Sequence, residues 1–438
     1  MKRTKGRSKF TVLIILLSMH SLFSFSQSDI MQTVRGKIID GDTKIPLIGA
    51  TIIVEGTEPM LGTITDFDGN FRFVNISMGR YNFKTSYLGY EPLTISEVLV
   101  GSGKQVVLTI EMKESTVLIN EVVVSANSSK DKPMNSMATL SARTFSVEET
   151  SRYAGGLDDP ARLASAFAGV ATTQTTNNAI IIRGNSPRGV LWRFEGVDIP
   201  AAFHFPNVDF VGGGGYTVLS NQMLRNSDFY TGAFPAEYGN ASSGVFDIKM
   251  RTGNTEKREY TAGIGTSGID FSAEGPFTKG KKSTYLFNYR YSTLALLGKL
   301  TDFPNLPTFQ DLTFKFDFPT QKAGTFSFWA MGANDTNKKE ADSDTLNWKT
   351  DYDRTGQDYF NRFGAIGFSH RISFGTKTYL QTTLSADGMR YGMDKKEYTF
   401  DFELLPTDYI ESTEGKYSFR TTVNHKFSPR ISSRSGVT

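Results

Sequence analysis

Hydrophobic and polar residues alternate along three segments of the region 255–438, at 283–292, 309–318 and 415–427. This period of two predicts β-strands, with aromatic and aliphatic side chains on one face and polar side chains on the other. The apolar faces hold Tyr285, Phe287, Tyr289 and Tyr291, then Leu312, Phe314, Phe316 and Phe318, then Tyr417, Phe419, Val423 and Phe427. A soluble sheet would turn the polar face to water, whereas a membrane barrel turns the apolar face to lipid.

The connections between these strands alternate between short and long. Short turns are predicted at 277–282, 319–323 and 374–376, and longer polar or mixed loops at 293–308, 334–357 and 400–415. Short turns at one end and long loops at the other are typical of outer-membrane barrels. The pattern therefore favours the membrane alternative and predicts about eight strands plus the start of another. A barrel of about eight strands has room inside only for side chains.

The region 31–113 has shorter strand patterns separated by turns, at 51–57, 69–76, 80–90 and 105–113. About seven short strands in a segment of this size predict a small β-sandwich. Asp66, Asp68 and Asn70 have the start of a calcium-loop spacing but lack the downstream bidentate Glu. A hairpin turn at Asp68-Gly69 explains the same residues more simply.

This region resembles the carboxypeptidase-regulatory-like domain. The matching residues are Gly49-Ala50-Thr51, Gly56-Thr57, Thr65-Asp66, Asp68-Gly69-Asn70-Phe71, Gly79-Arg80-Tyr81 and Gly89-Tyr90. The family's name suggests a peptidase, but none of the histidines at positions 20, 204, 370 and 425 has a glutamate at H-x-x-E spacing. No zinc site is therefore predicted, and we expect neither an enzyme nor a cofactor.

The N-terminus has the organisation of a secretory signal peptide. Basic residues at positions 2–9 precede the apolar segment 10–19, and Ser24-Phe25-Ser26 offers a small-x-small cleavage site. We therefore expect residues 1–26 to be removed on export; the alternative is a buried N-terminal strand. The chain has no cysteine, which excludes disulfides and a lipid-modified cysteine. The net charge of +3 gives no electrostatic reason to expect a nucleic-acid partner.

The region 135–252 contains two motif segments. In the first, strands at 180–182 and 190–194 are separated by turns at 183–185 and 195–196. The second follows at 221–254. Together they resemble the plug domain of TonB-dependent outer-membrane transporters, through Arg183-Gly184, Leu191-Trp192, Glu195-Gly196-Val197, Arg225, Gly232-Ala233-Phe234, Tyr238-Gly239 and Gly244-Val245. Glu195 stands where the family usually has aspartate.

The resemblance implies a mainly β chain with an N-terminal β-sandwich, a mixed α/β plug and the first part of an antiparallel transmembrane β-barrel at 255–438. About 22 strands form a complete plugged barrel, so the chain corresponds to about half of that architecture. The implied structural motif of the plug comprises Arg183, Gly184, Gly196, Arg225, Tyr238, Gly239 and Gly244. The plug arginines at positions 183, 188, 193 and 225 are expected to pair with acids on the inner barrel wall.

The loop between the two motif segments holds Phe203, His204 and Phe205, followed by four glycines at 212–215. The glycines lack the Lys-Ser/Thr of a phosphate-binding loop, so a flexible apical loop is predicted. In a plug this loop would face the extracellular mouth, where the three ring side chains are candidate ligand contacts. The alternative is that they pack against the barrel wall. No second ligand for a metal lies near His204 in the sequence.

The segment 119–127, INEVVVSAN, is strand-like but has no hairpin partner downstream. Its residues Glu121, Val122, Val123, Val124 and Ser125 resemble the TonB box of the same transporters. An extended β-branched segment can add as a strand to another protein's sheet. The alternative is that it forms the last strand of the sandwich.

The resemblance implies active import across the outer membrane of a Gram-negative bacterium, gated by TonB and its ExbB–ExbD partners. Siderophore, vitamin, oligosaccharide and peptide are all compatible ligands. A SusD-like lipoprotein would be a further partner if the chain resembles the glycan importers, although no residue pattern indicates it. The alternative function is a ligand receptor that transmits a signal without net transport.

Overall fold

The computed structural model describes residues 31–115, 133–138, 140–153, 155–156, 158–172, 178–206, 213–265, 268–293 and 307–438. The predicted signal peptide and the segment 119–127 lie outside these residues. No helix of the described residues is both long and apolar enough to cross a membrane.

The N-terminal region is a sandwich of two sheets. One sheet has the order β4-β1-β7, and the other has the order β3-β2-β5-β6. The strands are β1 (Met31–Asp40), β2 (Thr51–Glu55), β3 (Leu61–Ile64), β4 (Asn70–Ser77), β5 (Gly79–Ser86), β6 (Leu93–Val100) and β7 (Val106–Met112). Their inward side chains, among them Val34, Ile52 and Phe83, form a core of their own.

The turn at Asp66–Asn70 connects β3 of one sheet to β4 of the other, so it is a turn between sheets and not the predicted hairpin. The Asp66 carboxylate accepts hydrogen bonds from the backbone N–H groups of Asp68 and Asn70, at 2.9 and 2.8 Å. Gly69 has a φ of +75°, and a Cβ there would lie 2.7 Å from the Ile38 carbonyl oxygen. The Asp66 carboxylate thus stabilises the turn by accepting hydrogen bonds from the backbone, and the prediction of a turn is confirmed.

The central region is built around a five-stranded mixed sheet with the order β12-β11-β16-β15-β8. Strands β11 and β16 are parallel, and the other pairs are antiparallel. The elements are β8 (Ala142–Phe145), α2 (Val147–Arg152), α3 (Pro160–Ala164), β9 (Val170–Thr172), β10 (Ile180–Ile182), η2 (Pro187–Gly189), β11 (Val190–Phe194), β12 (Val197–Ile199), β13 (Phe203–His204), β14 (Tyr216–Thr217), β15 (Ser227–Tyr230) and β16 (Gly244–Ile248). The strands and turns predicted at 180–196 are confirmed.

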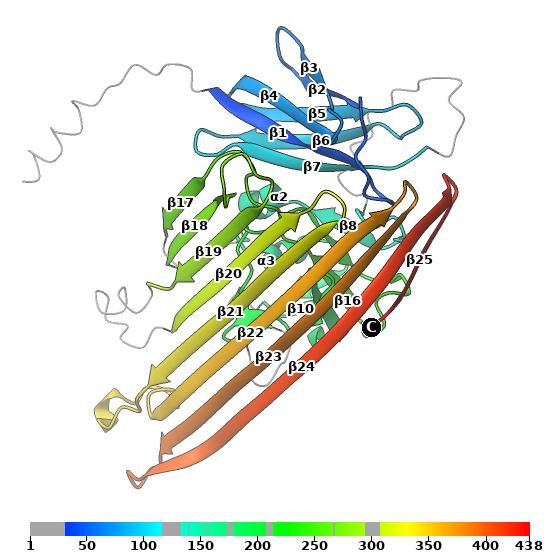
Figure 1. Ribbon diagram of the computed structural model, residues 1–438. Helices are drawn as coiled ribbons and strands as arrows, with labels where there is room; N and C mark the ends of the chain where they lie inside the picture. The colour runs from blue at the N-terminus through cyan, green and yellow to red at the C-terminus, as the bar shows by residue number, and fades with distance from the viewer. Residues whose placement is uncertain are drawn as a thin grey trace, which may run out of the picture.

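The C-terminal region is one long antiparallel sheet in which nine described strands pair in sequence order. They are β17 (Glu259–Ile264), β18 (Ile269–Pro276), β19 (Thr284–Tyr291), β20 (Thr308–Pro319), β21 (Thr325–Lys339), β22 (Thr355–Phe374), β23 (Thr378–Tyr398), β24 (Leu404–Ser428) and β25 (Ile431–Val437), with η3 (Thr345–Asn347) between β21 and β22. Figure 1 shows the central region against one face of this sheet and the sandwich across its end. The predicted fold class is confirmed.

The long sheet has its polar face inside. On β20, Asp311 and Lys315 are 2% and 7% exposed, whereas the intervening Leu312 and the later Phe318 are 37% and 40% exposed. The central region covers the polar face, and the aromatic face is open. This arrangement is opposite to that of a soluble sheet and matches the membrane alternative.

The stretch 400–415, predicted as a loop, is largely strand, which corrects that expectation. β24 begins at Leu404 and pairs with β23 from Tyr398↔Leu404 onward, with one irregularity at Lys395/Lys396. The polar composition of this stretch gives no strand pattern. Pairing with β23 nevertheless satisfies its backbone hydrogen-bonding groups, whatever the side chains are. Only the short connection 399–403 remains as a turn.

Candidate functional site

A set of buried and half-buried ion pairs, here called the charged seam, joins the central region to the inner face of the long sheet. Its centre is Glu237, whose Oε2 accepts a hydrogen bond from Arg420 Nη2 on β24 at 2.8 Å. Arg434 on β25 donates to Glu237 Oε1, and Asn135 Nδ2 donates to the same oxygen at 2.9 Å. Burial alone would raise the pKa of Glu237, but these partners, Arg434 foremost, hold it below its ordinary value.

Glu195 makes the second connection of the charged seam. It lies in the β11–β12 turn, and its Oε2 accepts from Lys315 Nζ on β20 at 2.8 Å. The other oxygen accepts from the backbone N–H of Met250 at 2.6 Å. Burial opposes the charge, but Lys315 outweighs it and the pKa of Glu195 is lowered. The glutamate at this turn thus reaches both the sheet and the central backbone.

His204 makes the third connection and is fully buried. Its Nδ1 lies 2.5 Å from Asp335 Oδ1 on β21, and its Nε2 lies 2.8 Å from Asp311 Oδ2 on β20. Arg290 on β19 also contacts Asp311, at 2.9 Å. Burial lowers the pKa of His204, but the two carboxylates outweigh burial and raise it above its ordinary value. The geometry therefore favours an imidazolium that bridges two strands of the sheet.

Apolar contact accompanies the charged seam. One buried hydrophobic cluster contains Trp192, Phe194 and Phe203 of the central region together with Trp329 and Phe363 of the sheet. The rings of Phe194 and Trp329 meet edge to face, with centroids 5.2 Å apart. The central region is therefore held to the sheet by a shared core as well as by ion pairs.

Three of the four arginines that were expected to pair with the sheet have other partners. Arg193 pairs with Asp198 at 2.7 Å, within the central region, and Arg225 pairs with Glu111 of the sandwich at 3.4 Å. Arg183 is exposed, and its guanidinium lies 3.5 Å from the Ser141 hydroxyl. The expectation that they would pair with acids of the sheet is corrected for these three.

At Glu237 and Glu195 the signs of the paired charges are the reverse of those predicted. The central region supplies the acid, and the sheet supplies the base. Glu237 was missed, although it directly precedes the Tyr238-Gly239 motif. Lys315 and Asp311 were already placed on the polar face of a strand by the alternation. The alternation predicts which face of the strand carries these residues. It does not predict their ion-pair partners, because the partners depend on how the central region docks on the sheet.

The other motif residues have packing roles where the structure describes them. Tyr238 is buried and its hydroxyl donates to Asp247 Oδ2 at 2.9 Å. Gly244 lies so close to its neighbours that a Cβ would be 2.1 Å from Ile182 Cδ1. Gly184 and Gly196 have φ values of +79° and +86°, which suit glycine in a turn. A Cβ on Gly239 would meet nothing within 4 Å.

The three candidate ligand contacts differ in exposure. Phe203 and His204 are 1% and 0% exposed and pack against protein. Phe205 is half-buried; its ring centroid lies 6.2 Å from that of Phe309 and 6.4 Å from that of Tyr359. In this arrangement only Phe205 of the three has a surface that a ligand could touch.

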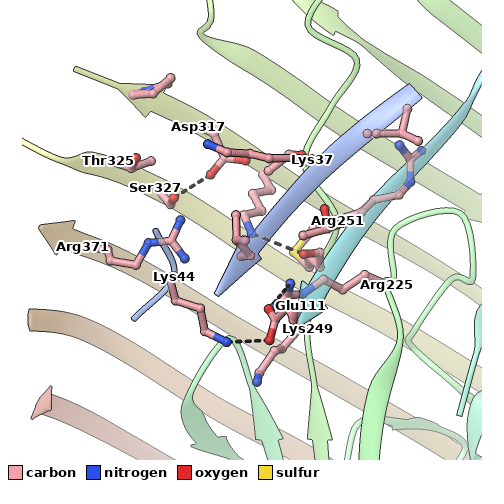
Figure 2. Close-up of a pocket in the computed structure, with 18 of the residues that line it drawn as sticks. Lys37, Lys44, Glu111, Arg225, Lys249, Arg251, Asp317, Thr325, Ser327 and Arg371 are labelled. Atoms are coloured by element: carbon pink, nitrogen blue, oxygen red, sulfur yellow. Dashed lines mark hydrogen bonds and ion pairs between the residues drawn. The ribbon is translucent and has the colours of Figure 1, made fainter. Parts of the chain in front are cut away.

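A cavity of about 860 Å³ lies between the sandwich, the central region and the adjoining part of the sheet. Charged side chains dominate its lining, among them Lys37, Lys44, Glu111, Arg225, Lys249, Arg251, Asp317 and Arg371. Figure 2 shows Lys44 and Arg225 both directed at Glu111. Lys44 and Arg225 hold the pKa of the Glu111 carboxyl at about 2, against the opposing effect of burial, which is the largest single influence. Such a lining favours a hydrated space.

The N-terminal region matches a known family model. Residues 34–124 match the model described as the CarboxypepD_reg-like domain. This confirms the resemblance found in the sequence and covers the whole sandwich from Val34 onward.

Two curated proteins are similar to the chain. The TonB-dependent receptor SusC of Bacteroides thetaiotaomicron is 38% identical over 122 residues, which are 27% of this chain and 11% of that protein. The TonB-dependent transporter Oar of Myxococcus xanthus is 22% identical over 240 residues, which are 53% of this chain and 21% of that protein. The chain thus spans about a tenth and a fifth of the length of these relatives.

Solved outer-membrane proteins are among the structural matches. The siderophore receptor PirA of Acinetobacter baumannii matches with a TM-score of 0.47 and 15% identity, over 66% of this chain and 46% of that one. The transporter YddB of Escherichia coli matches with a TM-score of 0.47 and 12% identity, over 65% and 45%. The chain therefore contains an N-terminal CarboxypepD_reg-like domain and is similar to TonB-dependent receptors and transporters.

Proposed function

We propose that the protein imports a ligand across the outer membrane by a TonB-dependent mechanism, without catalysis. In this proposal residues 135–252 are the plug, 255–438 are part of the barrel and 31–113 are a periplasmic domain. The relatives support transport or reception, since one is named a TonB-dependent receptor and the other a TonB-dependent transporter.

One observation carries the proposal, namely the inverted long sheet with a folded region against its polar face. Leu384 and Phe419 on the open face are 54% and 50% exposed, whereas Asp335 and Asn361 on the covered face are fully buried. Such a sheet suits lipid on one side and a polar interior on the other. The ion pairs of this interface can be rehydrated when the central region moves, and only the shared cluster around Trp329 would expose apolar surface to water.

The gate in this proposal is the segment 119–127. TonB would bind Glu121, Val122, Val123, Val124 and Ser125 by strand addition and pull on the central region through residues 128–132. These residues lie outside the described part of the chain. The ExbB–ExbD partners would supply the energy from the proton gradient.

The ligand would reach the loop that carries Phe205. Siderophore, vitamin, oligosaccharide and peptide remain the candidate classes, and a SusD-like lipoprotein remains a candidate partner at the cell surface. A half-buried aromatic ring beside Phe309 and Tyr359 can contact the apolar face of any of these ligands.

The test is energy-dependent uptake by the full-length protein with Val123→Pro. Proline removes a backbone donor from the added strand and should abolish uptake. The probes are a ferric siderophore, cobalamin, a malto-oligosaccharide and a short peptide, each labelled and offered with and without an intact proton gradient. Ser129→Pro, in the polar stretch that follows, is the matched control and should leave uptake intact. Undiminished uptake by the Val123 variant would refute the role of this segment.

The second candidate function is a receptor that signals without net transport. The contact between the sandwich and the central region favours it, because Arg225 and Glu111 link the two directly. A probe that binds the cells and changes gene expression, but never accumulates in the periplasm, would support this function over import.

A further inference from the structure

Lys426, near the end of β24, holds the sandwich through three carboxylates. Its Nζ lies 2.7 Å from Asp40 Oδ2, 2.8 Å from Glu114 Oε2 and 3.8 Å from Asp42 Oδ2. The lysine side chain is only 8% exposed. Asp40 Oδ2 also accepts a hydrogen bond from the Tyr90 hydroxyl at 2.7 Å. This cluster joins the C-terminal ends of the parallel strands β1 and β7 to the long sheet.

Glu111 on β7 forms the second cluster. It accepts from Lys44 Nζ of the sandwich at 2.5 Å and pairs with Arg225 of the central region at 3.4 Å. Glu111 is thus shared between the two regions. Because it is buried, either cation would leave it poorly compensated if removed.

Further contacts of the sandwich with the described part of the chain are also polar. Arg35 Nη2 donates to Asn254 Oδ1 at 2.5 Å, and Lys104 Nζ lies 3.4 Å from Glu274 Oε1 of β18. At the rim, Lys282 in the β18–β19 turn pairs with Asp68 at 2.9 Å, and both are well exposed. All of these partners lie at the end of the sheet with the short turns, which Figure 1 shows beneath the sandwich.

The interface between the sandwich and the rest of the chain therefore differs in chemistry from the interface between the central region and the long sheet. Within the described residues, no buried hydrophobic cluster contains side chains from both the sandwich and the rest of the chain. The central region and the long sheet, by contrast, share a cluster that includes Trp329. Separating the sandwich exposes ions that water can solvate, whereas separating the central region also exposes apolar surface.

We propose that the sandwich is a detachable cover on the short-turn end of the barrel, released as an intact domain before the central region moves. The docking surface is the ring of ionic partners around Lys426 and Arg225, and its occupant is the chain's own sandwich. Release opens the cavity of about 860 Å³, one wall of which is β1 and β7. This inference goes beyond the proposed function, because it holds for an importer and for a signalling receptor alike.

Two further features make release feasible. The sandwich keeps its own core, including Ile38, Phe73 and Ile110, so it remains folded when it leaves. Residues 116–132 join Glu114's end of the sandwich to the central region, and 17 residues extend at most about 60 Å.

The experiment uses the absence of cysteine from the chain. Asp68→Cys and Lys282→Cys place one thiol on each side of the rim, outside the two buried clusters. In the detergent-solubilised full-length protein, a short thiol-bridging reagent that fluoresces only after both thiols react reports the docked fraction. Phe205→Cys with Phe309→Cys is the matched pair across the interface between the central region and the sheet.

At low salt both pairs should bridge efficiently. At about 1 M salt, where the Debye length is about 3 Å, bridging of the rim pair should fall about tenfold and the matched pair should not change. Lys426→Glu should produce the same loss at low salt, because it sets a carboxylate against three others. Lys349→Glu, in the 340–354 connection at the opposite end of the sheet, controls for the charge change and should have no effect.

If the rim pair fails to bridge at low salt, the sandwich is not docked and the proposal is wrong. If it bridges equally at high salt, or if both pairs lose bridging together, the ordered release is wrong. The salt series leaves the two clusters around Lys426 and Glu111 unsubstituted. It therefore tests the proposal even if the Lys426 variant does not fold. The assay involves neither TonB nor a transported probe, so its failure is distinct from failure of the proposed function.

Discussion

The Glu237 carboxylate accepts a hydrogen bond from Arg420 on β24 at 2.8 Å, although the two residues are 183 positions apart. Arg420 is 9% exposed and also donates to the Gly196 carbonyl at 3.2 Å. The Arg420 side chain therefore contacts both motif segments of the central region.

Glu237→Gln should destabilise the folded protein by about 3 kcal/mol. The substitution keeps the shape of the side chain but leaves two guanidinium groups, the buried Arg420 and the half-buried Arg434, without their carboxylate. The measurement is the free energy of unfolding from denaturant titration in detergent. Glu414→Gln, an exposed glutamate on the same strand as Arg420, is the control and should change the stability little. Equal effects of the two substitutions would contradict the role of the charged seam.

The stability contributed by His204 should depend on pH. Its folded pKa is raised above the unfolded value of about 6.5, because Asp335 and Asp311 outweigh burial. A raised pKa means that the contribution is fully present below about pH 6.5 and is lost as the pH rises through the folded pKa. His204→Gln should remove this dependence. The comparison is the free energy of unfolding of both proteins from pH 5 to 9, and parallel curves would refute the imidazolium bridge.

The sandwich contact should weaken in strong acid. Glu111 has a folded pKa of about 2, below its unfolded value of about 4.3, owing to Lys44 and Arg225 acting against burial. Its contribution is present above about pH 4.3 and is lost as the pH falls through about 2. Glu111→Gln should show that loss already at neutral pH. Thermal unfolding of both proteins between pH 2 and 7 measures it, and an equal pH dependence of the two would count against the assignment.

Gly244→Ala should destabilise the central region, by about 1–3 kcal/mol. The added Cβ would lie 2.1 Å from Ile182 Cδ1 and 2.8 Å from the Tyr230 carbonyl oxygen, so both neighbours must move. Gly239→Ala is the matched control, because a Cβ there meets nothing within 4 Å. Denaturant unfolding should separate the two variants clearly. A destabilised Gly239 variant with a stable Gly244 variant would overturn this account.

The sequence by itself determined the elements and the faces. Period-two alternation placed Asp311 and Lys315 on one side of β20 and Leu312 and Phe314 on the other, because a strand allows no other arrangement. The glycines at 184 and 196 marked turns. The resemblance carried by the two motif segments then identified the kind of protein.

The tertiary structure decided what the sequence left open. Alternation is the same for a soluble sheet and a membrane sheet, and only docking of the central region showed which face is covered. The partners of Glu237, Glu195 and His204 come from strands more than 100 residues away. An ion pair depends on the distance between two side chains in space, which their positions along the chain do not fix. The sequence therefore determined the charges, and the fold determined their partners.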